Sequence, residues 1–264
     1  VRMKLDGKVC DSKIPSTYRI CYEIKGKPLI SIIIPNKDHI EELDKCIKSV
    51  EKKSTYRYFE IIIIENNSVE QSTFKYYKRI QQKYKNIKVV TWKGEFNYSK
   101  INNFGFKYAR GEQIVLLNND VEILTPDWIE QMLMYTQRSD VGAAGMMLYY
   151  PDDTIQHAGV ILGLGGIAGH SHKYFKRGEY GYVSRLTICQ NLSAVTAACL
   201  MVRSDVYRQV GGLDEGFAVA FNDVDFCVKI RKAGYLIVWT PYAEAYHYES
   251  KSRGLEDTPE KKNR

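Results

Sequence analysis

The sequence lacks several patterns that would assign it to a familiar class at once. No apolar run reaches the roughly 18 residues that a membrane-spanning helix needs, and the nearest one covers only residues 195–202. No Gly-Lys-Ser or Gly-Lys-Thr triplet is present, which excludes a P-loop. The cysteines form no C-x-x-C pair and no zinc-finger spacing with histidine. Internal repeats and low-complexity stretches are absent too, so the pattern favours an ordinary globular domain.

Composition and charge limit the cellular compartment and the kinds of binding partner that we expect. Four of the six cysteines lie in apolar or amphipathic surroundings, as reduced core thiols do, and we therefore expect a cytoplasmic protein, at most against the inner face of a membrane. The formal net charge of +7 favours anionic partners: nucleotide diphosphates, nucleic acid or an acidic membrane surface. The segment 75–88, rich in lysine and tyrosine, is typical of a solvated helix face, so we expect no nucleic-acid partner. Peripheral membrane contact stays open.

Short β-branched runs alternate with helical periodicity along the chain. This pattern predicts an α/β domain with a mostly parallel sheet covered on both faces. In the first half we expect strands at 29–34, 60–64, 87–91 and 113–117, and helices at 39–52, 71–84, 99–109 and 128–137. In the less regular second half we expect strands near 141–149, 194–202 and 235–239, and helices at 205–210 and 222–233.

Polar residues follow the predicted strands, at 36–38, 65–68 and 118–120. Ligands of such sheets bind beyond the carboxyl ends of the strands, so these residues are candidates for a site. Asp120 is the strongest of them, because a carboxylate held at the end of a buried strand suits a hard divalent cation. The alternative is a plain turn, which Asn and Asp also favour.

Two further carboxylates flank the start of the helix predicted at 222–233. Asp223 and Asp225 could each cap the helix or interact with its dipole, but they cannot both cap it in the same way. At least one of them is therefore a candidate for a cleft. His247 follows the last predicted strand and precedes Ser, Lys and Arg residues, so it could bind a metal near a phosphate. The alternative for His247 is a solvated polar tail.

Four glycines between residues 163 and 169 imitate a dinucleotide-binding loop, but their spacing is one residue too long. His170 and His172 could bind a metal there. We interpret the segment instead as a flexible glycine-rich loop with polar residues.

Taken together, these segments resemble family 2 glycosyltransferases. Residues 31–35 are similar to the family's opening strand, and residues 60–68 to its second strand with the acidic loop that meets the nucleoside. Asn118-Asn119-Asp120 stands where the family has its D-x-D motif. Other similar segments follow in the same order, namely 103–105 with 109–112, 211–215, and Asn222-Asp223. The match covers roughly residues 29–254 and is most similar to the subset found in bacterial polysaccharide and glycoprotein glycan assembly.

The resemblance implies a GT-A fold, which is a single α/β domain with a mostly parallel central sheet and helices on both faces. It implies transfer of a hexosyl residue from a UDP- or dTDP-sugar to a hydroxyl of a glycan, glycolipid or glycoprotein acceptor, with inversion at the anomeric carbon. Asp223, rather than Asp225, is the base it implies, at the mouth of the cleft if Phe221 packs inward. Asp120 and His247 are the expected ligands of Mn²⁺ or Mg²⁺. The expected nucleotide-sugar contacts are Pro35, Lys37, Glu65, Asn67, Asn103, Asn118, Asn119, Lys251 and Arg253.

The sequence departs from the family pattern at two positions. Asn118 replaces the Asp of many members, which leaves one carboxylate for the metal, and Asn222 replaces the usual Glu before the base-like Asp. The second change should affect acceptor contacts more than the reaction.

Two other functions stay open. A sugar nucleotidyltransferase shares this fold class, but it would carry a glycine-rich phosphate loop after the first strand, where this chain has Pro35-Asn-Lys-Asp38. An inactive nucleotide-sugar-binding module of a larger assembly protein is the other alternative.

The expected organisation is a lead-in segment at 1–28, the catalytic domain at 29–254, and the start of a C-terminal extension at 255–264. In that extension Thr258 is a candidate N-cap and Pro259 a first helical residue. Because this helix would begin without burying anything, we expect the chain to be one domain of a longer protein.

Overall fold

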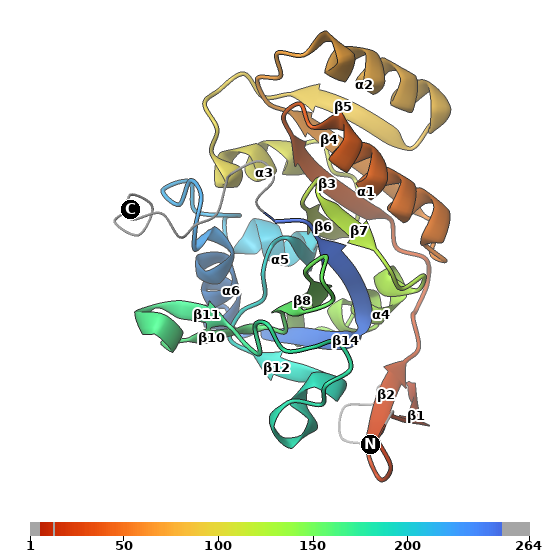
Figure 1. Cartoon of the computed structure of the whole chain (residues 1–264), viewed down its shortest axis with the longest axis vertical. Helices are drawn as coiled ribbons and strands as arrows, with labels where there is room; N and C mark the ends of the chain where they lie inside the picture. The colour runs from red at the N-terminus through yellow and green to blue at the C-terminus, as the bar shows by residue number, and fades with distance from the viewer. Residues whose placement is uncertain (1–5, 13, 250–264) are drawn as a thin grey trace.

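The computed structural model describes residues 6–12 and 14–249, and its centre is one large mixed sheet (Figure 1). The strand order is β12 (Gln190–Leu192), β14 (Leu236–His247), β8 (Val141–Tyr149), β13 (Cys199–Arg203), β6 (Gln113–Leu117), β3 (Ile30–Asn36), β4 (Phe59–Glu65) and β5 (Ile87–Thr91). Two short strands join this path at its side: β7 (Val121–Ile123) pairs with β14, and β9 (Ile155–His157) pairs with β8.

The direction of the strands changes across the sheet. β5, β4, β3 and β6 are parallel, as the alternation of strands and helices predicted. β13 then runs antiparallel to both β6 and β8, and β14 returns parallel to β8. The predicted α/β fold class is confirmed, and the parallel part is the half that precedes residue 118.

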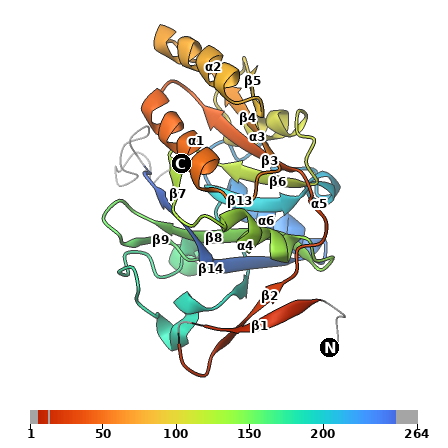
Figure 2. The same cartoon turned by 90° about the vertical axis from the view of Figure 1, so that its right-hand side faces the viewer.

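Helices cover both faces of the sheet, as expected (Figure 2). One face packs against α1 (Ile40–Lys53), α2 (Gln71–Lys83) and α4 (Trp128–Thr136), and the other against α3 (Tyr98–Phe106), α5 (Ser204–Gln209) and α6 (Asn222–Lys232). Alternate residues of β3 serve the two cores, because successive side chains of a strand point to opposite faces: Ile32 and Ile34 join the first and Ile33 the second. None of the described helices is both long enough and apolar enough to cross a membrane.

β14 is the largest departure from the predicted elements. We expected a strand over 235–239, but β14 continues through Pro241 to His247. The register with β8 is irregular between Thr240 and Glu244, and such an irregularity accommodates a proline that cannot donate to the ladder. This continuation carries His247 to the end of a strand rather than into a polar tail.

Two hairpins were also missed. The lead-in segment contains β1 (Gly7–Asp11) paired with β2 (Tyr18–Tyr22). The glycine-rich segment forms β10 (Val160–Leu162) and β11 (Ala168–His170), joined through the 3-10 turn η1 (Leu164–Gly166). Gly163 and Gly166 have φ of 86° and 100°, so these glycines serve a tight turn between the two strands. The extension predicted at 255–264 lies outside the described residues.

Candidate active site

The carboxyl ends of β3, β4 and β6 meet at one edge of the sheet, where the sequence placed the site. Asn36 at the end of β3 lies opposite Glu65 at the end of β4. From the loop after β6, Asn119 Nδ2 donates to Asn36 Oδ1 over 2.6 Å. Three segments that are distant in sequence are therefore joined by direct contacts at this edge.

Asp38 organises this edge, and sequence reasoning did not assign it a role. Its carboxylate accepts hydrogen bonds from the backbone N–H groups of Val69 and Glu70 and from Thr73 Oγ1, at 3.0–3.2 Å. Burial opposes ionisation, but these donors outweigh it and lower the pKa of Asp38. Asp38 thus fixes the loop between β4 and α2 against the end of β3. The sequence did contain a signal for this role, because Asp38 comes shortly after the first strand.

The predicted nucleoside contacts lie around this fixed loop. Glu65 is buried, and its Oε1 accepts from the backbone N–H of Ser68 over 2.7 Å. Asn67 adopts a left-handed conformation with φ of 55°, and its side-chain amide donates to the carbonyl of Gly94. Pro35, within β3, is half-buried, and Lys37, directly after that strand, is exposed.

Asn103 lies elsewhere and has other partners. Its Nδ2 donates to Leu213 O and Glu215 Oε1, and its Oδ1 accepts from Tyr207 Oη and Leu213 N. Asn103 therefore ties α3 to the segment 211–215. Lys251 and Arg253 lie outside the described residues.

Asp120 and His247 are brought together by strand pairing. β7 begins at Val121 and pairs with β14 so that Val121 lies opposite His247. His247 Nε2 lies 3.2 Å from Asp120 Oδ1 and 3.3 Å from Asn118 Nδ2, and both Asp120 and His247 are largely buried. The backbone N–H of Tyr248 also donates to Asp120 O. The predicted pairing of these two residues is therefore a consequence of the extended β14.

Gln156 of β9 determines which nitrogen of His247 carries a proton. Gln156 Nε2 faces two groups that can only accept, Glu249 Oε2 at 2.9 Å and His247 O at 3.4 Å. Its Oε1 therefore faces His247 Nδ1, at 2.6 Å, and Nδ1 must be the donor. The lone pair of the neutral ring is then on Nε2, on the side of Asp120.

His247 Nε2, which accepts from Asn118 Nδ2, and the Asp120 carboxylate oxygen both present lone pairs, so a proton or a cation between Asp120 and His247 would stabilise this contact. Neighbouring ligands of an octahedral ion with bonds of about 2.1 Å are about 3 Å apart, close to the 3.2 Å between these two atoms. The oxygen and nitrogen donors suit Mn²⁺ or Mg²⁺. Within residues 6–12 and 14–249, no group of three or more His, Cys, Asp or Glu side chains could hold a metal, so Asp120 and His247 form a pair of candidate ligands and not a complete site among these residues.

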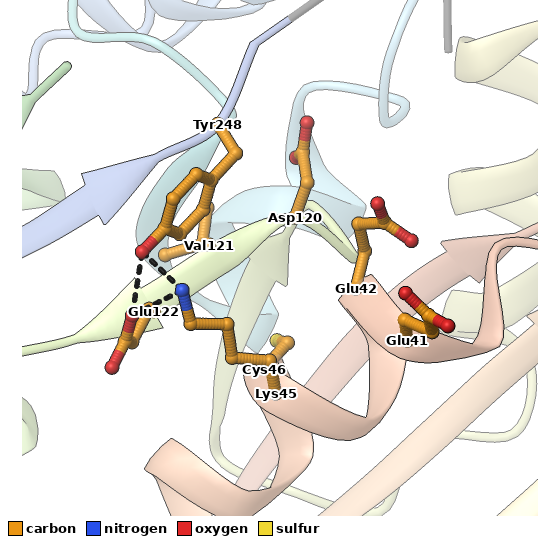
Figure 3. Close-up of a pocket in the computed structure, with 8 residues that line it drawn as sticks. All are labelled: Glu41, Glu42, Lys45, Cys46, Asp120, Val121, Glu122 and Tyr248. Carbon is orange, nitrogen blue, oxygen red and sulfur yellow. Dashed lines mark hydrogen bonds and ion pairs between the residues drawn. The ribbon is translucent and has the colours of Figure 1, made fainter. Parts of the chain in front are cut away.

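A cavity of about 150 Å³ adjoins Asp120 (Figure 3). Lys45 of α1 forms an ion pair with Glu122 of β7, and both contact the hydroxyl of Tyr248. Burial opposes the charged form of Lys45, but its hydrogen bonds to Tyr248 and Glu122 outweigh burial and raise its pKa. The Lys45–Glu122–Tyr248 group therefore holds the residue after β14 against α1, and the side chain of Asp120, which lines the same cavity, points away from this group (Figure 3).

Asp223 is the second residue of α6, and backbone donors fix both of its oxygens. Ala197 N–H donates to Oδ2 over 3.2 Å, and Val224 N–H donates to Oδ1 over 2.8 Å. Inward packing of Phe221 was the condition for placing Asp223 at the mouth of the cleft, and Phe221 is 38% exposed with φ of 59°. The left-handed conformation of Phe221 turns the chain into α6. Asp225 instead pairs with Lys229 one turn along the helix, at 3.6 Å.

One short segment connects the two halves of the site. Ala197 N–H binds Asp223, and the carbonyl of the next residue, Ala198, accepts from the backbone N–H of Asn118. Asp223 is thus linked through two adjacent residues to the loop that holds Asp120. The structure therefore brings the predicted base and the predicted metal ligands to the same part of the molecule.

A larger cavity of about 470 Å³ lies at the opposite end of the parallel strands. It is lined by the N-terminal hairpin and by residues that precede β3 and start β6, such as Pro28 and Gln113. Since ligands of these sheets bind at the carboxyl ends, the smaller cavity next to Asp120 is the relevant one.

Comparison with known proteins adds three findings. The family model described as "Glycosyl transferase family 2" matches residues 31–211, which is more than half of the chain. An uncharacterized protein, y4gI, of Sinorhizobium fredii is 47% identical over 95% of the chain. The O-antigen biosynthesis protein RfbC of Myxococcus xanthus is 35% identical over 94% of the chain. The chain spans 28% and 20% of the lengths of these two relatives.

A solved structure has the same fold at low sequence identity. The structure of GalNAc-T7 with UDP, GalNAc and Mn²⁺ aligns with a TM-score of 0.72 at 14% identity, over 88% of this chain and 45% of that one. The fold is therefore GT-A, as the sequence predicted.

Proposed function

Because the chain belongs to glycosyl transferase family 2, we propose that it transfers a hexosyl residue from a UDP- or dTDP-sugar to a hydroxyl of a glycan, glycolipid or glycoprotein, with inversion. The observation that carries this proposal is the link from Asp223 through Ala197 and Ala198 to the Asn118–Asp120 loop. It joins a carboxylate suited to proton transfer with a carboxylate and an imidazole suited to a cation. The role of RfbC in O-antigen biosynthesis and the UDP and GalNAc bound to GalNAc-T7 are consistent with it.

The donor nucleotide would bind at the edge formed by Pro35, Lys37, Glu65 and Asn67. A buried carboxylate such as Glu65 can accept from the imide N–H of uracil or thymine, a donor that cytosine lacks. Lys37, exposed at this edge, can balance the charge of a phosphate. Asn118 and Asn119 add amide donors where the diphosphate would lie.

Asp120 and His247 would hold the divalent cation, which when bound neutralises the diphosphate leaving group. Gln156 keeps the Nε2 lone pair of His247 on the side of Asp120, where a cation would replace the Asn118 amide as its partner. Asp223 would take the proton of the acceptor hydroxyl. Its two oxygens each accept one backbone N–H and so have a fixed orientation, while further lone pairs remain for the acceptor.

A cytoplasmic location is part of this proposal. All six cysteines are unpaired in the structure, which is typical of proteins from reducing compartments.

Asp223→Asn tests the proposal, because the amide keeps the size of the side chain but cannot accept the proton. We expect kcat to fall by about 10²–10⁴-fold while the affinity for the nucleotide sugar stays near that of the wild type. Asp225→Asn is the matched control: it removes a partly exposed pair with Lys229 and should cost under about 1 kcal/mol of stability without lowering kcat. A near wild-type rate for Asp223→Asn would show that the base is elsewhere. Full activity in excess EDTA would remove the cation from the proposal.

A further inference from the structure

Two histidines on β9 and β11 form a buried pair that the proposed reaction does not use. His157 is 1% exposed, and its Nδ1 lies 2.8 Å from Nδ1 of His170. The rings meet edge to face with centroids 5.0 Å apart. The backbone N–H of Thr196 points at His157 Nε2 over 3.4 Å. This pair lies at the base of the β10–β11 hairpin, which sequence analysis treated as a flexible loop.

The contacts determine the protons of both rings. A backbone N–H can only donate, so His157 Nε2 must accept, and the hydrogen of the neutral ring is on Nδ1. His157 therefore donates to His170 Nδ1, and His170 must carry its own hydrogen on Nε2. Burial lowers the pKa of His157 well below its usual range, and burial also lowers the pKa of His170, so both rings are neutral.

The outer nitrogen of His170 is left as a donor in a defined direction. Within the described part of the chain, no hydrogen bond of His170 Nε2 is found, and the residue is only half-buried. Asp223 is near enough for its charge to oppose the lowering of the His170 pKa by burial. The Thr196–Ala197 peptide also connects the two groups, because Thr196 N–H points at His157 and Ala197 N–H binds Asp223.

Building on the function proposed above, we propose that His170 is an acceptor-binding residue whose Nε2–H donates to a hydroxyl oxygen of the acceptor sugar next to Asp223. A neutral N–H donor matches an uncharged hydroxyl, whereas a phosphate is better bound by a cation. His157 acts through His170 as a positioning residue, since it fixes the tautomer that makes Nε2 a donor.

The test separates transfer from hydrolysis in the same enzyme. The wild type and variants are assayed with the nucleotide sugar that it turns over, first with water alone and then with p-nitrophenyl glycosides as acceptor probes. For His170→Phe we expect the acceptor KM to rise about 3–10-fold, as for the loss of one neutral hydrogen bond, with the hydrolysis rate unchanged. His170→Gln, whose amide reaches a position similar to Nε2, should restore most of the acceptor KM. His157→Asn, which keeps a donor near the Nδ1 position, should be milder than His157→Leu.

The inference is overturned if His170→Phe leaves the acceptor KM unchanged. It is equally overturned if His170→Phe lowers hydrolysis and transfer in parallel, since that result indicates a structural role only. If the wild type binds nucleotide sugars but neither hydrolyses nor transfers them, the proposed function fails and this inference fails with it.

Discussion

Gln156→Met should weaken metal binding without a direct contact to the metal. The wild-type Gln156 Oε1 accepts from His247 Nδ1 over 2.6 Å in a buried setting, and methionine keeps the volume but cannot accept this hydrogen bond. His247 is then free to rotate or to place its hydrogen on Nε2. Loss of such a partner of a metal-binding histidine costs about 10–100-fold in metal affinity, which corresponds to about 1.4–2.7 kcal/mol.

The assay is a Mn²⁺ titration of nucleotide-sugar hydrolysis, and the activation constant should rise by that factor while the rate at saturating metal changes little. Gln131→Met is the matched control, because Gln131 is also buried and hydrogen-bonded, to Asp127 at the start of α4. Equal activation constants for Gln156→Met and Gln131→Met would refute the argument from the tautomer. A loss of folding in both variants would be detected by their thermal melting curves before the titration.

Three further changes test the nucleoside edge and the scaffold. Glu65→Ala should weaken UDP binding about tenfold or more by calorimetry, as for a hydrogen bond to a charged group, and an unchanged affinity would remove Glu65 from the site. Glu60→Gln should lower stability by about 0.5–1.5 kcal/mol at neutral pH, because Glu60 accepts two hydrogen bonds from the Arg110 guanidinium, whose exposure to solvent weakens the pair. Burial opposes ionisation of Glu60, but the hydrogen bonds from Arg110 lower its pKa in the folded state. The stability that this pair contributes is therefore complete above the unfolded pKa near 4.5 and is lost as the pH falls through the lower folded pKa. Denaturation at pH 7 and at pH 3 should show that the stability difference between wild type and variant shrinks in acid. Gly111→Ala places a Cβ 2.6 Å from the backbone nitrogen of Ser31 and should cost about 1–3 kcal/mol in urea unfolding, whereas wild-type stability would contradict this close contact.

The parallel half of the fold was predictable because its strands are short apolar runs with clear ends. Asp120 was a candidate for the same reason, since it lies in the polar triplet that follows such a run. β9 is only three residues long and has no periodicity that a sequence pattern could detect. Gln156 and His157 gain their importance only from their partners His247 and His170, and these contacts form when distant segments pack together.

The second half also shows where local patterns mislead. Pro241 interrupts the apolar pattern of β14, and the sequence alone therefore indicates that the strand ends before it. Tertiary pairing with β8 and β7 carries the strand past this proline. His170 is surrounded by glycines, which favour a flexible loop, and the contact with His157 is invisible to that argument.

The position of β14 late in the chain has a consequence for the order in which the site forms while the protein is synthesised. His247 ends the last described strand, and its contact Asn118 is 129 residues earlier in the chain. Because chains fold from the N-terminus as they are synthesised, the nucleoside edge and Asp223 are made well before His247 can join them. Contacts of such long range also form late, since loop closure must precede them. A nascent chain on the ribosome can therefore form its donor edge early, yet it acquires the complete Asp120–His247 pair only when β14 inserts beside β8.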